Sequence, residues 1–281
     1  MQAAELNPVT QVATSTVTDN RGILEPLGVI TQGLLRDSVV VIPALNEEES
    51  LGHLLRDLKV VLPETKFLVV DGNSTDRTRE VAELLGTDVI LQIGKGKGAA
   101  LRQALALDLK VGNVIIMDAD RSMSPHEIPA LVDALRSGAD MVKGSRFLPG
   151  GSSEDLSLLR RFGAHLFVGL VNWIWSRHYS DLCYGFLALK ADAVRRLHPY
   201  LTTTNFEIET EMCIKAAKLG LTVAEVPSKE LMRFYGRSHL FLVRDGFLIL
   251  KTILREWFVG QRSVTSNEAI GATVDNPLSR L

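Results

Sequence analysis

Two aspartates, Asp118 and Asp120, stand one residue apart directly after the apolar run at residues 114–117. A short, continuously hydrophobic run is typical of a strand buried on both faces, so both carboxylates should project from its carboxyl end. In open α/β sheets that end faces the ligand crevice. Two carboxylates this close repel each other unless a cation joins them, and Mg²⁺ is commonly held by one or two carboxylates plus substrate phosphates. A plain polar turn is the alternative interpretation.

Two other acidic or amide-bearing loops follow predicted strands. The first is Pro43-Ala44-Leu45-Asn46-Glu47, in which Asn46 could instead cap the next helix and Glu47 could complement its dipole. In the second, Asp71 opens a Gly-Asn-Ser-Thr-Asp turn that could equally be a capped turn. Acidic residues at such positions in α/β nucleotide sites hold a base edge or a ribose hydroxyl.

A glycine-rich loop, Gly94-Lys95-Gly96-Lys97-Gly98, opens a predicted helix. Its spacing matches neither a Walker A loop nor a dinucleotide fingerprint. Glycines let backbone N–H groups approach an anion at a helix N-terminus, and Lys95 or Lys97 adds positive charge. A phosphate contact and a flexible surface turn are both compatible with the sequence.

These loops are embedded in a regular alternation of strands and helices, which predicts βαβ units and a mostly parallel sheet in an α/β fold. The predicted strands of the first half are 38–43, 67–70, 88–92, 114–118 and 140–143. The predicted helices between them are 47–62, 75–85, 98–109 and 125–137. The second half adds long helices at 156–175, 205–219 and 240–258, with short strands after residue 186 and at 222–227. We interpret this as a nucleotide-binding half extended by an acceptor-binding half.

Composition restricts the class of protein. The 281 residues are 46% hydrophobic with a net charge of −2, so no basic field suggests a nucleic-acid partner. The two cysteines lie far apart without a metal-binding pattern, which favours a reducing, cytoplasmic setting. No signal peptide is recognisable, and no apolar run reaches the roughly 18 residues of a spanning helix.

Five motifs in this order carry a resemblance to a known family. They are Val-Ile-Pro-Ala-Leu-Asn-Glu-Glu, Val-Val-Asp-Gly-Asn-Ser-Thr-Asp-Arg-Thr, Gly-Lys-Gly, Met-Asp-Ala-Asp and Gly-Ser-Arg-Phe. The chain resembles the family 2 glycosyltransferases with the GT-A fold, and is most similar to their dolichol- or polyprenyl-phosphate sugar synthase branch. The resemblance runs from about Val39 to about Glu256. It implies a glycosyltransferase domain at 37–259, between a partly disordered extension at 1–36 and a flexible tail at 260–281.

The resemblance also implies roles for the loops on the donor side. A nucleoside-diphosphate sugar carrying uracil or guanine would be bound by Pro43, Ala44, Asn46, Glu47, Asp71, Lys97 and the Asp118-Ala119-Asp120 segment. Asp118 and Asp120 would bind Mg²⁺ or Mn²⁺, which acts as a Lewis acid on the leaving diphosphate. Arg146 would support the metal-binding loop or the acceptor side.

On the acceptor side the resemblance covers three segments. Asp181 to Phe186 matches the family's Asp-x-x-x-Gly-Phe segment, and Glu207 and Glu209 match its acidic segment. The resemblance implies catalytic roles for Asp181, Glu207 and Glu209. A carboxylate of Glu207 or Glu209 could accept the proton of an acceptor hydroxyl, whereas a phosphate acceptor needs no base. The basic loop at 233–239 resembles one that grips phosphate through Arg233, Arg237, Ser238 and its last residue. That last residue is His239 where lysine is usual, so Arg237 could compensate and another small acceptor stays open.

Two apolar stretches, 162–175 and 240–258, are too short or too interrupted by charge to span a bilayer. Contact with a membrane interface, burial in the core and a face between copies of the chain all stay open for them. We therefore expect a metal-dependent inverting glycosyltransferase, cytoplasmic and peripheral at the inner face of the cell membrane. Its acceptor would be a polyprenyl phosphate or another small molecule. A sugar-1-phosphate nucleotidyltransferase and a non-catalytic nucleotide-sugar-binding protein are the alternatives.

Overall fold

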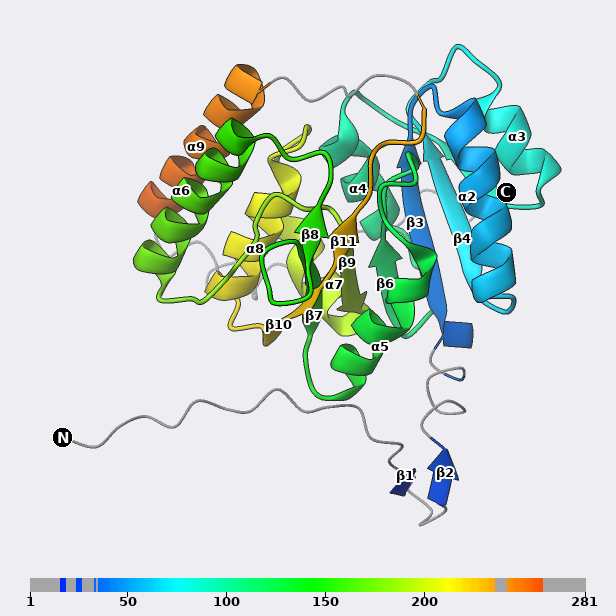
Figure 1. Cartoon of the computed structure of the whole chain (residues 1–281), viewed down its shortest axis with the longest axis horizontal. Helices are drawn as coiled ribbons and strands as arrows, with labels where there is room; N and C mark the ends of the chain where they lie inside the picture. Colours follow the sequence, from blue (N-terminus) through cyan, green and yellow to red (C-terminus); the bar gives the residue numbers. More distant parts are fainter. Residues whose placement is uncertain (1–15, 19–23, 27–32, 34, 236–241, 260–281) are drawn as a thin grey trace, which may run out of the picture.

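A seven-stranded sheet forms the centre of the computed structural model, which describes residues 16–18, 24–26, 33, 35–235 and 242–259 (Figure 1). The strand order is β10-β7-β9-β6-β3-β4-β5. These strands are β3 (Ser38–Ala44), β4 (Lys66–Asp71), β5 (Asp88–Leu91), β6 (Asn113–Ile116), β7 (Met141–Ser145), β9 (Leu187–Lys190) and β10 (Val223–Pro227). Only β9 is antiparallel to its neighbours, β6 and β7. The predicted mostly parallel sheet is confirmed.

Helices cover both faces of the sheet. One face carries α2 (Glu48–Val61), α3 (Thr78–Leu84), the 3₁₀ turn η1 (Pro125–Glu127) and α5 (Ile128–Arg136). The other face carries α4 (Lys97–Leu105), α7 (Ala191–Leu197) and α8 (Ile208–Lys218), with the 3₁₀ turn η2 (His198–Tyr200) after α7. Two further helices, α6 (Leu158–Trp175) and α9 (Leu242–Phe258), lie side by side beyond α8 (Figure 1).

The middle of strand β3 is apolar because both faces of the strand are buried. In β3, Val39 and Val41 belong to the core under α4 and α8, whereas Val40 and Ile42 belong to the core under α2 and α5. A strand in this position needs hydrophobic residues on both faces, which is why residues 39–42 show no alternation with polar residues. The polar side chain of β3, the buried Ser38, stands at its first position.

The structure differs from the sequence expectations at several boundaries. Strand β6 ends at Ile116, and the Met117 amide donates one more hydrogen bond to the Val41 carbonyl, so Asp118 lies just beyond the ladder. Asn46 does not cap α2: the N-cap residue is Glu47, whose own side chain makes no capping hydrogen bond, and Asp76 Oδ2 accepts from the Glu48 amide at 3.2 Å. From β3 onward, four elements were not predicted, namely α7, η2 and the paired short strands β8 (Ser152–Ser153) and β11 (Lys229–Glu230).

The N-terminal extension contains a described antiparallel pair, β1 (Thr16–Thr18) with β2 (Leu24–Pro26). The tail at 260–281 and three residues of the predicted basic loop, Arg237, Ser238 and His239, lie outside the described residues. No helix within the described parts of the chain is long and apolar enough to cross a membrane.

Helix α9 is fastened to α8 through the buried carboxylate of Glu256. Lys215 Nζ lies 2.8 Å and Lys218 Nζ 2.9 Å from Glu256 Oε2, and Arg255 contacts the other oxygen. Burial alone would raise the pKa of Glu256, but the hydrogen bonds and charges of the two lysines lower it below its ordinary value. The ionised carboxylate therefore stabilises the folded state.

The substitution Glu256→Gln is expected to lower the free energy of unfolding at pH 7 by about 2 kcal/mol, because charge-assisted hydrogen bonds are lost. The stabilisation is complete above the ordinary glutamate pKa and disappears as pH falls through the lowered pKa of the folded protein. Urea denaturation of both proteins at neutral and acidic pH measures this. Glu83→Gln, which removes an exposed partner of Arg79, is the control and should change stability by under about 0.5 kcal/mol. A Glu256→Gln deficit that persists unchanged in acid would contradict the assignment.

Candidate active site

The carboxyl ends of β3, β4, β6 and β7 lie at one edge of the sheet, where the antiparallel β9 begins (Figure 1). Parallel pairing places the loops after these strands side by side. The last strand residues and the loops carry the predicted donor-side residues Pro43, Ala44, Asn46, Glu47, Asp71, Asp118, Ala119, Asp120 and Arg146. The predicted convergence of polar loops is therefore present in the structure.

The loops after β3 and β4 are bound to each other by hydrogen bonds. Asn46 has a left-handed backbone (φ 55°), and its Oδ1 accepts from the Thr75 amide at 2.8 Å. The Asn46 amide in turn donates to Ser74 Oγ at 2.9 Å. Asp71 is buried and accepts from the Ser74 amide at 3.2 Å. These contacts join the two loops through Ser74, which is hydrogen-bonded both to the Asn46 backbone and to the Asp71 carboxylate.

Lys97, the first residue of α4, is a buried cation between two carboxylates. Its Nζ lies 2.5 Å from Asp118 Oδ1 and 2.6 Å from Glu209 Oε1, and its side chain is 9% exposed. Lys97 thus joins the strand-end aspartate to the first turn of α8, more than 100 positions along the chain. The observed position of Lys97 beside the Asp118 carboxylate is compatible with the prediction that Lys97 lies by the diphosphate.

The charges of this cluster shift one another's pKa values. Burial opposes the charge of Lys97, but Asp118 and Glu209 outweigh it and raise the pKa of Lys97 above its ordinary value. Burial also raises the pKa of Glu209, and Lys97 opposes that rise. For Asp120, burial and the nearby Asp118 charge both raise the pKa. Burial and the Asp118 charge thus make the ionised form of Asp120 less favourable than it would be in water.

Three glycines are required where backbones and side chains meet at this cluster. A Cβ at Gly96 (φ 91°) would lie 2.3 Å from the Thr204 carbonyl oxygen, and one at Gly98 would lie 2.8 Å from that of Thr203. A Cβ at Gly185 would lie 2.5 Å from Lys97 Nζ and 2.8 Å from Glu209 Oε1. The Gly-Lys-Gly loop is thus packed against the loop before α8 rather than free in solvent.

Residues 228–235, which we call the strap, cross the Asp118-Ala119-Asp120 loop. The Leu231 amide donates to the Ser122 carbonyl at 2.9 Å, and the Phe234 amide donates to the Asp120 carbonyl at 3.2 Å. Arg233 contacts the Glu47 carboxylate and lies 3.3 Å from Asp120 Oδ2. A guanidinium of this chain therefore stands beside the second aspartate of the pair.

The residues around Asp118 and Asp120 fit a hard divalent cation completed by a phosphate ligand. The two carboxylates supply oxygen donors, and Mg²⁺ and Mn²⁺ are commonly held this way. Within the described residues, no cluster of three or more His, Cys, Asp or Glu side chains is arranged to hold a metal ion. The remaining ligands would have to come from the diphosphate, from water or from residues outside the described chain.

Replacing Arg233 with glutamine is expected to tighten Mn²⁺ binding in the absence of nucleotide. A cation binding at Asp120 competes with the Arg233 guanidinium, and removing a partly exposed ion pair of about 1 kcal/mol corresponds to roughly a fivefold change. Isothermal titration with MnCl₂ measures the affinity directly. Arg77→Gln, an exposed arginine paired with Glu80, is the control and should match the unsubstituted protein. Weaker Mn²⁺ binding by Arg233→Gln would contradict competition at Asp120.

Arg146 and Asp181 form a buried pair behind the site. Arg146 Nε and Nη2 donate to Asp181 Oδ2 and Oδ1 at 2.7 and 3.0 Å, and Arg146 Nη1 lies 3.2 Å from Glu230 Oε2. Asp181 is fully buried, and Arg146 holds its pKa below the ordinary value against the effect of burial. These contacts fasten β7, β11 and the segment before β9 together. They favour a positioning role for Asp181, and its catalytic role stays a prediction.

The two acidic residues of the acceptor side differ in their surroundings. The Glu209 carboxylate forms an ion pair with Lys97. Glu207, the N-cap residue of α8, is buried, and its Oε2 has no hydrogen-bond partner among the described residues. Burying a carboxylate oxygen without a hydrogen-bond partner costs free energy, so such an atom is often found bound to a ligand, a water molecule or a proton. Of the two, Glu207 therefore has the free acceptor atom.

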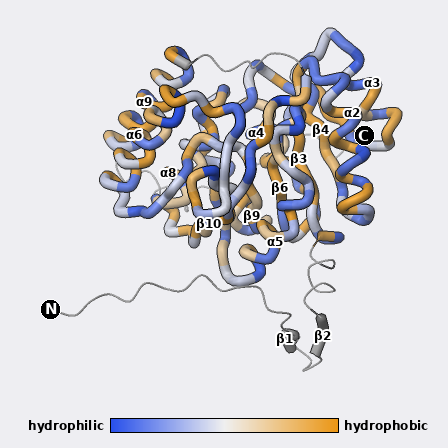
Figure 2. The backbone as a smooth tube through the Cα atoms, in the orientation of Figure 1, coloured by the Kyte–Doolittle hydropathy of each residue, from blue (hydrophilic) through white to orange (hydrophobic). Residues whose placement is uncertain are grey.

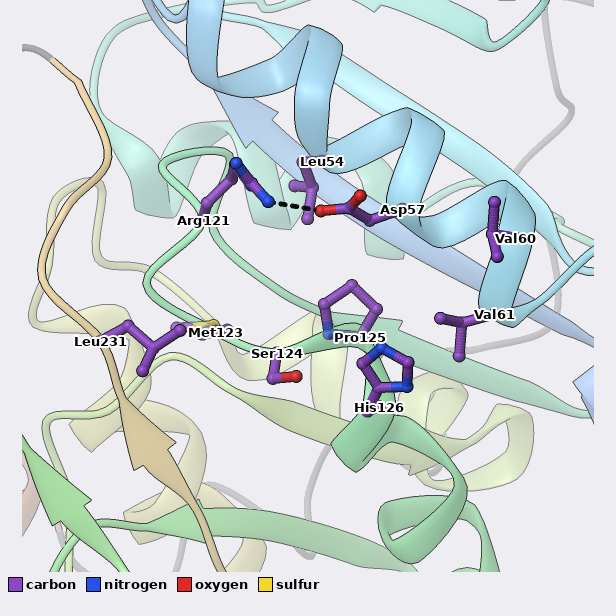
Figure 3. A pocket seen from close by; sticks show the side chains of 10 residues that line it. All are labelled: Leu54, Asp57, Val60, Val61, Arg121, Met123, Ser124, Pro125, His126 and Leu231. Carbon is purple, nitrogen blue, oxygen red and sulfur yellow. Dashed lines mark hydrogen bonds and ion pairs between the residues drawn. The ribbon is translucent and has the colours of Figure 1, made fainter.

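A cavity of about 320 Å³ lies next to this site, between α2 and η1 (Figure 3). Arg121, the residue after Asp120, has a left-handed backbone (φ 63°) and reaches into the cavity, where it lies 2.6 Å from Asp57 Oδ2. The other lining residues are Leu54, Val60, Val61, Met123, Ser124, Pro125, His126 and Leu231. None of the carboxylates Asp118, Asp120, Glu207 and Glu209 lines it, so we place the chemistry at the strand edge and not in this cavity.

Some residues of the site had no recognisable signal in the sequence. Glu230 is a single acidic residue in a short polar stretch, and only the fold brings it to Arg146. Arg121 was not singled out either, although it stacks on the Phe234 ring at 4.5 Å and so holds the strap. The glycine at 185 was predicted only as part of its segment, and the close approach of Lys97 explains it.

Comparisons with known proteins agree with this geometry. A model of the family described as glycosyl transferase family 2 matches residues 39–258. Glycosyltransferase AglJ of Haloferax volcanii is 32% identical, over 78% of this chain and 72% of its own length. A dolichyl-phosphate hexose transferase of the same organism is 32% identical, over 80% of this chain and 96% of its own.

Among solved structures, glucosyl-3-phosphoglycerate synthase from Mycobacterium tuberculosis, in complex with Mn²⁺, UDP and glucosyl-3-phosphoglycerate, superposes with a TM-score of 0.65. It is 21% identical and covers 83% of this chain and 84% of its own. At this identity the similarity establishes the fold, which is the predicted one.

Proposed function

Because the chain belongs to glycosyl transferase family 2, in its polyprenyl-phosphate sugar synthase-like branch, we propose that it transfers a sugar from a nucleoside-diphosphate donor to a polyprenyl phosphate. That it is a glycosyltransferase follows from the family. The observation that carries the donor proposal is the gathering of Asp118, Asp120, Lys97 and Arg233 at the strand edge, where carboxylates and cations of the chain alternate. A metal-bound diphosphate has the charge pattern that this arrangement accepts.

On the donor side, each group of residues has a separate task in this proposal. Asn46 and Asp71, held together by the loops after β3 and β4, would accept hydrogen bonds from the base or ribose. Asp118 and Asp120 would hold Mg²⁺ or Mn²⁺, which when bound neutralises charge on the leaving diphosphate. Lys97 keeps Asp118 in place and adds a cation beside the same phosphates.

On the acceptor side, the proposed reaction is an inverting displacement. The acceptor oxygen forms a bond to the anomeric carbon of the sugar, while the bond from that carbon to the diphosphate oxygen breaks. A phosphate acceptor is already an anion, so no proton has to be removed and the basic residues of the strap would bind it. With a hydroxyl acceptor, the unpartnered Oε2 of Glu207 would accept the proton.

The polyprenyl-phosphate acceptor is supported by the similarity to a dolichyl-phosphate hexose transferase and by the basic strap. Such an acceptor lies in a membrane, so the proposed reaction takes place at a membrane surface. The sugar-1-phosphate nucleotidyltransferase is disfavoured because the loop after β3 has no glycine-rich, basic sequence there. A non-catalytic nucleotide-sugar-binding protein would not need the paired carboxylates of Asp118 and Asp120.

A nucleotide-sugar screen tests the donor part of the proposal. Melting temperatures would be measured against a panel of UDP- and GDP-sugars with MnCl₂, because a ligand at 100 times its Kd stabilises a protein by about 2.7 kcal/mol. The donor that stabilises would then be incubated with undecaprenyl phosphate, with and without EDTA. We expect release of nucleoside diphosphate that EDTA abolishes. Release of pyrophosphate would instead identify a nucleotidyltransferase, and stabilisation without turnover a binding protein.

A further inference from the structure

Helix α9 has its apolar side facing outward. Its exposed residues recur at helical spacing along one face: Val243, Phe247, Leu250, Leu254 and Trp257, continued by Phe258. The opposite, buried face contains two acidic residues and a threonine among its isoleucines: Asp245, Ile249, Thr252, Ile253 and Glu256. A helix at the surface of a water-soluble domain normally has the reverse arrangement. Since the apolar residues are those that solvent reaches, they are available to a partner outside the described chain.

Helix α6 also exposes large apolar residues and lies next to α9 (Figure 1). Only Ala164 and Val171 are buried in its 18 residues. Its exposed large apolar residues are Leu158, Leu159, Phe162, Leu166 and Trp173. The Trp173 and Trp257 rings meet edge to face at 6.3 Å between centroids and so join the two exposed stripes. Figure 2 shows hydrophobic colour along both helices. We call this combined surface the α6/α9 face.

The charges of the α6/α9 face are basic. Helix α6 contains no Asp or Glu, and both acidic residues of α9 are buried. The charged residues that α6 and α9 expose are Arg161, Arg244 and Lys251, although the whole chain carries a net charge of −2. Glu256, paired with Lys215 and Lys218, holds α9 in the rotation that turns its acids inward. The face thus combines aromatic and aliphatic side chains with a cationic fringe.

We propose that the α6/α9 face is the surface through which the protein docks on an anionic lipid bilayer. A helix with apolar and aromatic residues on one side and basic residues beside them lies in the plane of a membrane interface. Anionic headgroups attract the basic residues. A second copy of this chain fits less well, because a symmetric interface would bring the same cations of both copies together. This docking surface rests on the proposed function in one respect: a polyprenyl-phosphate acceptor would lie in the same bilayer.

The position of the face relative to the site agrees with docking. Helix α6 follows β8, whose Ser153 contacts Glu230 beside Arg146, and α9 is the next described element after the strap. Both helices start on the side of the sheet that carries the strand-end loops (Figure 1). A bilayer in contact with the α6/α9 face would therefore reach the side of the sheet whose strand-end loops carry Asp118 and Asp120.

Vesicle sedimentation of the full chain tests the proposal. The vesicles consist of phosphatidylcholine alone or of phosphatidylcholine with about 30% phosphatidylglycerol. They contain no polyprenyl phosphate, and no nucleotide sugar is added. We expect cosedimentation with the anionic vesicles and at least roughly tenfold less with the neutral ones. The double variants Phe247→Ser/Trp257→Ser and Arg244→Glu/Lys251→Glu are each expected to lose roughly tenfold or more of the binding to anionic vesicles.

Matched controls remove exposed groups elsewhere on the surface. Leu84→Ser/Ile93→Ser removes two apolar residues that are more exposed than Trp257, and Lys110→Glu reverses an exposed charge. Both should bind vesicles like the unsubstituted protein. Equal binding by the α6/α9 variants and the controls would overturn the proposal. The proposal would also be overturned if the unsubstituted protein bound no vesicles and formed a dimer in light scattering that Phe247→Ser/Trp257→Ser converts to monomers.

The vesicle result is independent of turnover, since no donor or acceptor is present. Transfer to a short-chain polyprenyl phosphate in detergent should stay within about twofold in the Phe247→Ser/Trp257→Ser variant, because these residues are outside the site. Vesicle binding without transfer by the unsubstituted protein would reject the proposed function and leave the docking surface intact. Transfer in detergent without vesicle binding would reject the docking surface alone.

Discussion

Replacing Asp118 with asparagine is expected to reduce sugar transfer by at least about 100-fold. The substitution removes one of the two carboxylates proposed to hold the metal and the nucleotide diphosphate, and loss of one such electrostatic contact typically costs a factor of about 100 to 1,000. Lys97 keeps its second partner, Glu209, so the fold should persist. The measurement is the initial rate of nucleoside diphosphate release at saturating donor and MnCl₂.

Two additional measurements show that the lost activity arises from the metal. Mn²⁺ affinity in the presence of nucleoside diphosphate should fall in parallel with the rate of Asp118→Asn, while the melting temperature changes little. Asp108→Asn, which alters a highly exposed aspartate in the loop after α4, is the control and should retain full activity. A fully active Asp118→Asn protein would refute the metal assignment.

Replacing Arg146 with methionine is expected to lower the free energy of unfolding by about 3–5 kcal/mol. The variant leaves the fully buried Asp181 carboxylate, together with Glu230, without its cation, and removing one partner of a buried ion pair has an effect of this size. Arg146→Lys keeps one charge but not the bidentate geometry, so its loss should be intermediate. Urea denaturation of the three proteins measures the differences, and a loss below about 1 kcal/mol for methionine would contradict the structural role.

The same pair separates a positioning role of Asp181 from a catalytic one. If Asp181 acts through Arg146, Asp181→Asn should lose stability and activity together, and its pH–rate profile should keep its shape. A stable Asp181→Asn protein that has lost catalysis would instead support the catalytic role that the family resemblance implies.

Much of the sheet and of its functional edge could be predicted from local sequence patterns. Apolar runs such as residues 39–42 predict buried parallel strands because each face of the central sheet lies under helices. The polar loops after these runs then have to meet at one edge. The antiparallel β9 was not predictable as such, because a four-residue buried strand has the same composition in either direction.

The pairing of charges within the site could not be predicted, because it depends on contacts between distant segments. Lys97 meets Glu209 from 112 positions away, and Arg233 meets Glu47 from 186. No local pattern distinguishes Glu207, with its unpartnered oxygen, from Glu209. In the same way, the amphipathic pattern of residues 242–258 predicts a helix with two faces. Only the structure shows that the acidic face is buried against α8.

Transfer of a radiolabelled sugar from the donor identified in the screen to undecaprenyl phosphate in vesicles tests the proposed metal-dependent sugar transfer directly. We expect label to enter the organic phase as a sugar-phosphate lipid, in equal amount to the nucleoside diphosphate released. EDTA and Asp118→Asn should each abolish this product. Release of nucleoside diphosphate or pyrophosphate without any labelled lipid would contradict the proposed sugar transfer.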